Sequence, residues 1–401
     1  MLAKGALKGI RILDFSHMIA GPYATLLLAY FGAEVIKVES KYRMDGFRIR
    51  EGDDPDASRP YNDFNRNKHG ITLNLKTDEG RELARELAKM SDAVVENFSA
   101  GVIDKLGLGY PVLRELKPDT VMVSLQGLGK TGPKKSFVTW GPSILSISGM
   151  TYLWNHPDMK EPVGSQTAYA DYVAGAHGAL AMLAGLFYRK KTGKGVHVDV
   201  SQAESTMYML GPLLLSALRD GVLVSPQGNA HPLYVPSGCY PCAGEDRWCV
   251  IEIRSDEEWW RMCDLFGRED WKADSRFADV LGRIRHRDML DRMLSEETRL
   301  KSVEQVMNLL QGAGIAAGYV MNGKDLVEDE HLRRRGYLTP VLHPKMETSE
   351  YPGIPIGLSR TPGGVQRHGP LLGQDNQYVF CDLLGLPSDQ VEDLIRRDVI
   401  A

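Results

Sequence analysis

The sequence has few cysteines and no excess of charge of either sign. Five cysteines in 401 residues are too few for a disulfide scaffold, which indicates a reducing compartment. Lys and Arg together number 48 against 52 Asp and Glu, so the formal net charge is -4. This balance excludes a nucleic-acid-binding protein that depends on a positive field over its whole surface, and no nucleic-acid partner is expected.

Long uncharged apolar runs are missing as well. No stretch of about 18 or more apolar residues without a charge occurs, so we expect no membrane span and no membrane partner. Near the N-terminus, Lys4, Lys8 and Arg11 interrupt any apolar core of the kind that a signal peptide requires. These absences together predict a cytoplasmic protein.

The sequence signatures of several enzyme classes are absent. The first predicted strand is followed by SHMIAGPYAT, which contains neither GxGxxG nor GxxxxGK(S/T), so a dinucleotide-dependent dehydrogenase is disfavoured. HExxH and GxSxG do not occur, so zinc-protease and serine-hydrolase functions lack support. Cys239 and Cys242 form one CxxC pair, with Cys249 and Cys263 as further thiols, but no second pair and no neighbouring HxxxH completes a metal site. Buried thiols are the favoured interpretation, and no metal is predicted.

Short apolar runs alternate with helical patterns through the first half of the chain. The first two runs flank an apolar stretch at 23–31 that predicts a helix, which implies a parallel strand–helix–strand unit with a right-handed crossover. The repeated pattern predicts an α/β fold with an open parallel sheet, in which ligands bind at the carboxyl ends of the strands. The predicted strands are 10–15, 33–39, 71–76, 93–98, 120–127 and 196–201.

The clearest helix is predicted at 171–189. Ala174, Gly175 and Gly178 lie on one side of it, where small residues allow another backbone to come close. Asp171 stands where this helix begins, and two interpretations of it are open. It is either an N-cap carboxylate or a nucleophile, because an ionised carboxylate at the mouth of a cleft can attack an activated acyl group. The helix dipole favours the ionised form in both cases.

Three regions are predicted along the chain. Residues 1–224 form a large domain that contains the strand–helix alternation. A linker with Pro and Gly at 225–241 opens a small α/β domain, predicted over 225–325 from further apolar runs and helical patterns. Residues 326–401 are rich in proline, are predicted to be mostly loop, and end in a short helix near 388–397.

Seven segments, taken together and in order, carry a resemblance to a known family. They are LKGIRILDFSHMIAGPYAT, GAEVIKVE, NRNKHGITLNLK, VVENFSAGVIDKLGLGY, GLGKTGP, AYADYVAGAHGALAMLAGLFYRKKTGKGVHVDVSQAE and GNAHPLYVPSGCYPCAGEDRW. They resemble the family III CoA-transferases. The resemblance implies a Rossmann-like large domain with a parallel sheet, a smaller α/β domain, a C-terminal segment that returns to the large domain, and an interlocked dimer. The partner is either an identical chain or a paralogue in a heteromer.

The resemblance assigns the chemistry to Asp171. Its carboxylate attacks the thioester of an acyl-CoA donor, forms a mixed aspartyl–acyl anhydride and then an aspartyl-CoA thioester, and CoA passes to a free carboxylic acid. The CoA thioester is a substrate, and no permanently bound cofactor is implied. The residues that match CoA contacts of the family are His17, Leu73, Lys76, Asn97, Phe98, Val102 and Lys105, with Lys41 expected near a phosphate.

Two departures from the family bear on the substrate. Ile19 stands where formyl-CoA transferases carry a catalytic glutamine, which argues against oxalate. Trp140 stands near the place of a histidine in acyl-CoA racemases, which argues against racemase or isomerase activity, the alternative enzyme function. The segment TWGPSILSISGMTYLW resembles a subgroup that uses succinyl-CoA and larger acids such as benzylsuccinate. Its large apolar side chains either line an acyl pocket or pack in the core; they are Trp140, Ile144, Tyr152 and Trp154.

Overall fold

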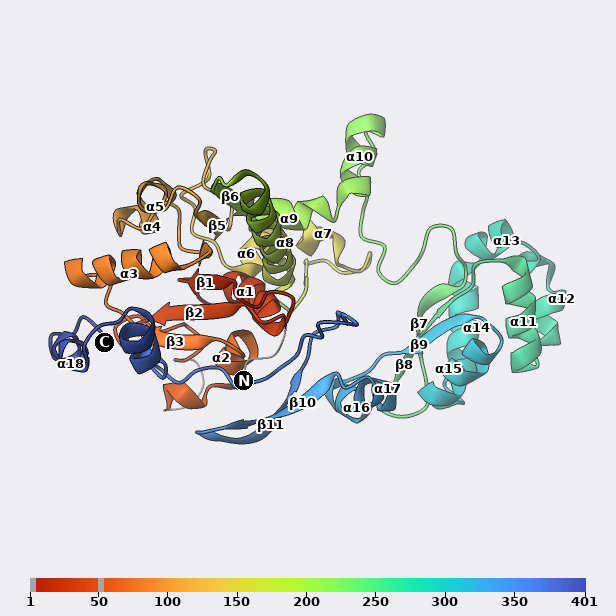
Figure 1. The fold of residues 1–401 in the computed structure, drawn as a ribbon. Coiled ribbons are helices and arrows are strands. Elements are labelled where there is room, and N and C mark those ends of the chain that lie inside the picture. Colours follow the sequence, from red (N-terminus) through yellow and green to blue (C-terminus); the bar gives the residue numbers. More distant parts are fainter. Residues whose placement is uncertain (1–4, 50–53) are drawn as a thin grey trace. The chain divides into compact units, whose positions relative to one another are not determined.

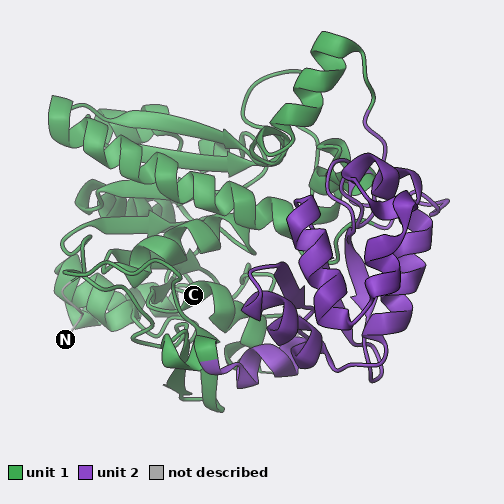
Figure 2. Cartoon of the chain, turned by 90° about the vertical axis from the view of Figure 1, so that its right-hand side faces the viewer, with its two compact units in different colours: residues 1–152, 164–223, 331–401 green, residues 153–163, 224–330 purple. Residues whose placement is uncertain are grey.

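The computed structural model describes residues 5–49 and 54–401, and the chain divides into two compact units (Figure 2). Lys4, which entered the argument against a signal peptide, lies outside the described residues. Unit 1 comprises residues 1–152, 164–223 and 331–401, and unit 2 comprises residues 153–163 and 224–330.

The division into three folding domains, 1–224, 225–325 and 326–401, stays a prediction. The compact units differ from it, because residues 153–163 and 224, which the sequence pattern assigned to the large domain, belong to unit 2. Residues 326–330, which were assigned to the C-terminal segment, belong to unit 2 as well. The C-terminal residues 331–401 belong to unit 1.

Unit 1 is built on one six-stranded parallel sheet with the strand order β3-β2-β1-β4-β5-β6 (Figure 1). This order confirms the predicted open α/β sheet. From β1 the chain continues to β2 and β3 on one side of the sheet and then returns to form β4 on the other side of β1. A topological switch point therefore lies between β1 and β4, and doubly wound proteins bind ligands at such a point. The strands are β1 (Arg11–Asp14), β2 (Glu34–Glu39), β3 (His69–Thr72), β4 (Ala93–Glu96), β5 (Val121–Gln126) and β6 (Val196–Ser201).

One predicted strand is displaced along the chain. A strand was expected at 71–76, but β3 ends at Thr72. Asn74 leaves the sheet because its N–H donates to the carbonyl of Val399 and its own carbonyl accepts from Thr77. These bonds begin the turn that leads into the next helix.

Strand side chains alternate between two apolar cores, one on each face of the sheet. The helices of unit 1 are α1 (Ala20–Tyr30), α2 (Arg59–Asn65), α3 (Asp78–Met90), α4 (Val102–Lys105), α5 (Tyr110–Leu116), α6 (Gly141–Ile147), α8 (Tyr169–Thr192), α9 (Gln202–Tyr208), α10 (Gly211–Asp220), a π-helix at Gln377–Leu383 and α18 (Ser388–Arg396), with α7 (Met150–Leu153) and α17 (Glu330–Arg334) at unit boundaries. Ile12 joins the core beneath α1 and α8, and Leu13 joins the core beneath α3 and α18. A hairpin of β10 (Leu338–His343) and β11 (Met346–Pro352) also belongs to this unit.

Helix α8 is, within the described residues, the one helix long and apolar enough to cross a membrane by length and composition. The side of α8 that carries the small residues packs against α1 and the sheet of unit 1. An added Cβ at Gly175 would lie 2.7 Å from the carbonyl oxygen of Ala20, and one at Gly178 would lie 2.7 Å from Leu125 Cδ2. The close approach predicted for this side is confirmed, and α8 is a core helix that covers one face of the sheet.

Unit 2 encloses its own core, which holds the buried side chains of Cys242, Cys249 and Cys263, while Cys239 is half-buried. Burial raises the pKa of the Cys249 and Cys263 thiols to about 12. No group of three or more His, Cys, Asp or Glu that could hold a metal occurs in residues 5–49 and 54–401. The elements are an antiparallel sheet of β7 (Ser237–Pro241), β8 (Trp248–Glu252) and β9 (Ala316–Tyr319), with α11 (Asp256–Phe266), α12 (Glu269–Ala273), α13 (Val280–Arg285), α14 (Arg287–Thr298), α15 (Val303–Gly312) and α16 (Gly323–Glu328).

Buried charges brace the carboxyl ends of β1 and β2. Asp14 is fully buried and its Oδ2 lies 3.1 Å from Lys68 Nζ, while Lys37 Nζ lies 3.0 Å from Asp45 Oδ2. Burial alone would raise the pKa of Asp14, but the two lysines and two hydroxyl donors outweigh it and lower that pKa to about 2. Asp45 accepts the N–H of Met18 at 3.1 and 3.2 Å, which shapes the loop that follows β1.

Asp14→Ala is expected to lower the free energy of unfolding by about 3–5 kcal/mol, because it leaves Lys68 buried without its partner. Urea titration followed by circular dichroism measures the change. Asp220→Ala is the control, since it removes an exposed carboxylate that pairs with Arg219 and should cost less than about 1 kcal/mol. A loss at Asp14 no larger than the loss at Asp220 would contradict the bracing role.

Candidate functional site

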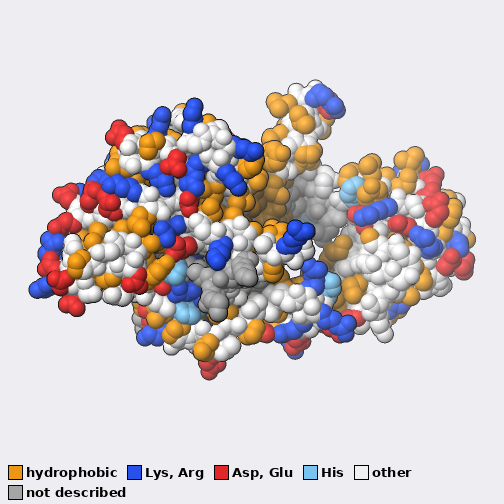
Figure 3. Space-filling model, in the orientation of Figure 1, with side chains coloured by type: hydrophobic (Ala, Val, Ile, Leu, Met, Phe, Trp, Pro, Cys, Tyr) orange, Lys and Arg blue, Asp and Glu red, His pale blue; other side chains and the backbone are white. Residues whose placement is uncertain are grey.

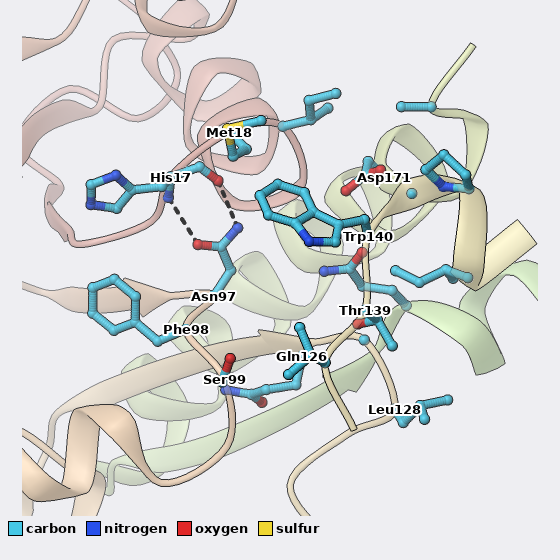
Figure 4. Close-up of a pocket in the computed structure, with 18 of the residues that line it drawn as sticks. His17, Met18, Asn97, Phe98, Ser99, Gln126, Leu128, Thr139, Trp140 and Asp171 are labelled. Carbon is cyan, nitrogen blue, oxygen red and sulfur yellow. Dashed lines mark hydrogen bonds between the residues drawn. The ribbon is translucent and has the colours of Figure 1, made fainter. Parts of the chain in front are cut away.

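A cavity of about 770 Å³ opens at the carboxyl edge of the sheet in unit 1 (Figure 4). It lies beside the switch point, among the loops that follow β1, β4 and β5 and the first turns of α6 and α8. A volume of this size suits a small-molecule ligand. The lining includes His17, Asn97, Phe98, Gln126, Trp140 and Asp171.

The loops after β1 and β4 are tied to each other across the switch point. The N–H of His17 donates to Asn97 Oδ1 at 2.8 Å, and Asn97 Nδ2 donates to the carbonyl of His17 at 2.8 Å, as the dashed lines of Figure 4 show. Met18 follows in a left-handed conformation with φ 67°, and the Asp45 carboxylate holds its N–H. Burial and the charge of Lys37 lower the pKa of His17 to about 4, so its ring is neutral at pH 7.

A smaller cavity of about 150 Å³ adjoins the first and has a mostly apolar lining. His17 and Phe98 line both cavities, and their ring centres lie 5.8 Å apart. The smaller cavity brings together most of the residues that the sequence assigned to CoA binding, and Asn97 lines the larger one. Those in the smaller cavity are His17, Leu73, Lys76, Phe98 and Val102.

Two residues expected at the CoA site do not line either cavity. Lys41 Nζ pairs with the Asp398 carboxylate, and Lys105 is exposed at the end of α4. Arg43 lines both cavities instead, with its guanidinium carbon 5.6 Å from the centre of the Phe98 ring. Sequence reasoning missed Arg43, although its place just after the carboxyl end of β2 was a usable signal.

Asp171 is the third residue of α8, and its side chain lines the larger cavity. It does not cap the helix, whose N-cap is Ala168, so the capping interpretation is wrong. Oδ2 lies beside Gly141, where an added Cβ would come within 2.6 Å of it, so glycine leaves this oxygen room. Burial raises the pKa of Asp171 from 3.8 to about 6, which outweighs the expected preference of the helix dipole for the ionised form.

Part of the apolar segment at 139–154 faces this cavity. Trp140 and Ile144 line it, which favours the pocket interpretation for these two side chains. Tyr152 is 55% exposed and is not among the lining residues, so it neither lines the pocket nor packs in the core. Trp154 belongs to unit 2 and is about half exposed.

Comparison with known proteins identifies relatives of the whole chain. Residues 7–376 match the model of CoA-transferase family III. The probable CoA-transferase Rv1866 of Mycobacterium tuberculosis is 34% identical over 98% of this chain, which spans 50% of the length of that relative. The succinyl-CoA–D-citramalate CoA-transferase of Chloroflexus aurantiacus is 32% identical, and 98% of each chain is covered. The crystal structure of a CAIB/BAIF family protein from Brucella suis has a TM-score of 0.86 at 28% identity, covering 94% of this chain and 99% of that one.

This chain therefore belongs to CoA-transferase family III. The relatives from Mycobacterium tuberculosis and Chloroflexus aurantiacus both carry the name CoA-transferase, so the enzyme class predicted from the motifs is confirmed. The substrates of such enzymes are a CoA thioester and a carboxylic acid.

Asp171→Asn is expected to stabilise the protein at about pH 7.5 by about 1–3 kcal/mol. The folded state raises this pKa from 3.8 to about 6, so the wild type loses stability as pH rises through this range, and the uncharged variant does not. Urea titrations at about pH 4 and about pH 7.5 measure the difference, which should vanish at the lower pH. A structural carboxylate would give the opposite sign, so a variant less stable than the wild type at about pH 7.5 contradicts the prediction.

Proposed function

We propose that this enzyme transfers coenzyme A from an acyl-CoA donor to a free carboxylic acid, with Asp171 as the nucleophile. The observation that carries the proposal is the exposure of a desolvated carboxylate to the larger cavity. Its burial outweighs the hydrogen bond that it accepts from its own main-chain N–H, so the carboxylate is poorly solvated. With a pKa of about 6 it is mostly ionised at neutral pH, and poor solvation makes an ionised oxygen a stronger nucleophile.

The proposed chemistry consists of four acyl-transfer steps, and in each of them one bond forms while another breaks. An Oδ atom of Asp171 attacks the thioester carbonyl carbon, the C–S bond breaks, and CoA departs as a thiolate. The product is a mixed anhydride of Asp171 and the donor acid. The thiolate then attacks the Asp171 carbonyl carbon, and the donor acid departs with one aspartyl oxygen. The acceptor carboxylate attacks the resulting aspartyl thioester, and the released thiolate attacks the acceptor carbonyl, which returns the carboxylate of Asp171.

CoA is proposed to span both cavities. Its nucleotide end would occupy the smaller, apolar cavity, and its thioester would reach Asp171 in the larger one past the shared wall of His17 and Phe98. Arg43 and Lys76 line the smaller cavity and are suitably charged for the phosphates. No permanently bound cofactor takes part in this scheme.

Succinyl-CoA is the proposed donor, because one relative of nearly equal length is named for it. The alternative, an acyl-CoA racemase or isomerase, needs a base that can take the α-proton. His17 is the one histidine that lines the larger cavity within the described residues, and burial lowers its pKa to about 4. Such a ring is a weak base at neutral pH, which favours transfer over racemisation.

A second copy of the chain is proposed as the partner, in an interlocked dimer, with a paralogue in a heteromer as the alternative. Large apolar side chains stand exposed along α8, α9 and α10, and orange side chains gather along α10 in Figure 3. Leu218 is 83% and Tyr208 80% exposed, and exposed patches of this kind mark protein interfaces. Sedimentation of the purified chain should give twice 44.6 kDa, and a mass of 44.6 kDa would contradict the homodimer.

The cytoplasm is the proposed location. The five cysteines are free, as expected in a reducing compartment, and one side of α8 packs in the core of unit 1. Neither a nucleic acid nor a membrane is proposed as a partner.

Asp171→Ala is expected to lower CoA transfer by at least about 1000-fold, because it removes the attacking oxygen. Donor acyl-CoA with hydroxylamine should inactivate the wild type by modifying the peptide that contains Asp171, and the variant should not be modified. CoA-ester mass spectrometry with a panel of acids measures transfer. Asp389→Ala is the control, since it removes an exposed carboxylate of α18 that lies outside both cavities. Near-normal turnover by the Asp171 variant would exclude the nucleophile.

A further inference from the structure

A third cavity, of about 300 Å³, lies in unit 1 next to the larger one. Phe64 and Tyr172 line both cavities, so these two side chains form a partition between them. Tyr172 directly follows Asp171 in α8. The rest of the lining comes from α1, from the end of α2 and from the segment 337–355, and the chemistry proposed above gives these residues no role.

Tyrosines dominate the polar part of this lining. They are Tyr23, Tyr30, Tyr172 and Tyr337. Tyr23 and Tyr172 meet edge to face, with their ring centres 5.0 Å apart. Burial and the neighbouring Tyr337 raise the pKa of Tyr23. Burial, followed by Asp63 and Tyr23, raises the pKa of Tyr172. These two hydroxyls therefore stay protonated at neutral pH, and each can donate a hydrogen bond.

One buried cation also lines the third cavity. Arg66 is 3% exposed, and its Nε and Nη2 donate to the hydroxyl of Tyr30 at 3.1 and 2.6 Å. Its Nη1 donates to Asp63 Oδ1 at 2.8 Å, and the side chain of Asp63 is 52% exposed. Arg66 thus balances the charge of Asp63, the one carboxylate in this lining among the described residues. Because that carboxylate is half exposed, solvent weakens its repulsion of a bound anion.

The remaining walls are apolar. Leu26 and Leu27 of α1 face this cavity together with Ile354 and Pro355. Hydroxyl donors beside apolar walls suit a ligand that has an anionic acceptor at one end and an apolar chain at the other. A cation would lie close to Arg66, and a polyol would leave hydroxyl groups against the leucines. A carboxylic acid with an apolar chain fits both parts of the lining.

We propose that the third cavity binds the free carboxylic acid that exchanges at Asp171. Its carboxylate accepts hydrogen bonds from the hydroxyls of Tyr23 and Tyr337, and its apolar chain lies along the leucines of α1. This inference rests on the proposed function. In that scheme the CoA thioester approaches past His17 and Phe98, on the side of the smaller cavity, so an acid held behind Phe64 and Tyr172 does not compete with CoA for space.

The test is equilibrium binding of hexanoate to the full chain without CoA, measured by ligand-observed NMR titration. Tyr23→Phe and Tyr337→Phe should each raise the Kd of hexanoate about fivefold to tenfold, because each variant loses a donor to a charged oxygen and keeps the ring. Asp63→Asn should lower that Kd about threefold, because it removes a negative charge beside the site. The Kd of hexanamide, which is uncharged, should not respond to Asp63→Asn.

Tyr188→Phe is the matched control, since Tyr188 also belongs to α8 but is 45% exposed and lines none of the three cavities. Its Kd for hexanoate should equal that of the wild type. In the transfer reaction, Tyr23→Phe and Tyr337→Phe should raise the KM of the acid and leave the KM of the acyl-CoA unchanged.

Three results would overturn the inference while the proposed function stands. They are failure of hexanoate to bind the wild type, equal Kd values in the wild type and the Tyr23, Tyr337 and Asp63 variants, and an equal rise in the KM of both substrates. Hexanoate binding that responds to these variants as expected, in a protein that transfers CoA to no acid, would support the acid site and contradict the proposed function.

Discussion

The two hydrogen bonds between the main chain of His17 and the side chain of Asn97 are the constraint on which the site depends. They join the loops of β1 and β4 at the one place where the strand order reverses, and both cavities meet there. Buried charges hold the same loop from behind, because Lys37 pairs with Asp45 and Asp45 holds the N–H of Met18. Pairing is what makes these buried charges tolerable, so the site is shaped by electrostatics as well as by apolar packing.

The burial of Asp171 lowers the stability of the folded protein at neutral pH, and we propose that the same burial makes its carboxylate more reactive. Burial raises its pKa to about 6, which costs folding free energy at neutral pH and leaves the carboxylate poorly solvated. Two features of the sequence permit this placement. The glycines of α8 let the helix lie close to α1 and the sheet, and Gly141 leaves space for the carboxylate oxygen. Active sites often contain groups of this kind, whose charge the fold does not stabilise.

Much of the fold followed from local pattern, since short apolar runs located all six parallel strands with small errors at the ends. Family motifs pointed to Asp171, His17 and Phe98, and all three side chains line the larger cavity. What sequence could not give depends on distant partners. Lys41 forms an ion pair with Asp398, which lies near the other end of the sequence, and local sequence does not reveal such a partner. The tyrosines of the third cavity come from three separate segments of the chain, which only the fold brings together.

The fate of the acceptor oxygens tests the central claim most directly. In the proposed mechanism the acceptor carboxylate attacks an aspartyl thioester and the resulting anhydride is cleaved at the acceptor carbonyl, so one acceptor oxygen remains on Asp171. A single turnover with an acid labelled with heavy oxygen in both carboxylate positions, followed by peptide mass spectrometry, measures this transfer. The covalent mechanism predicts one heavy oxygen in the side chain of Asp171. CoA transfer that leaves this side chain unlabelled would contradict it.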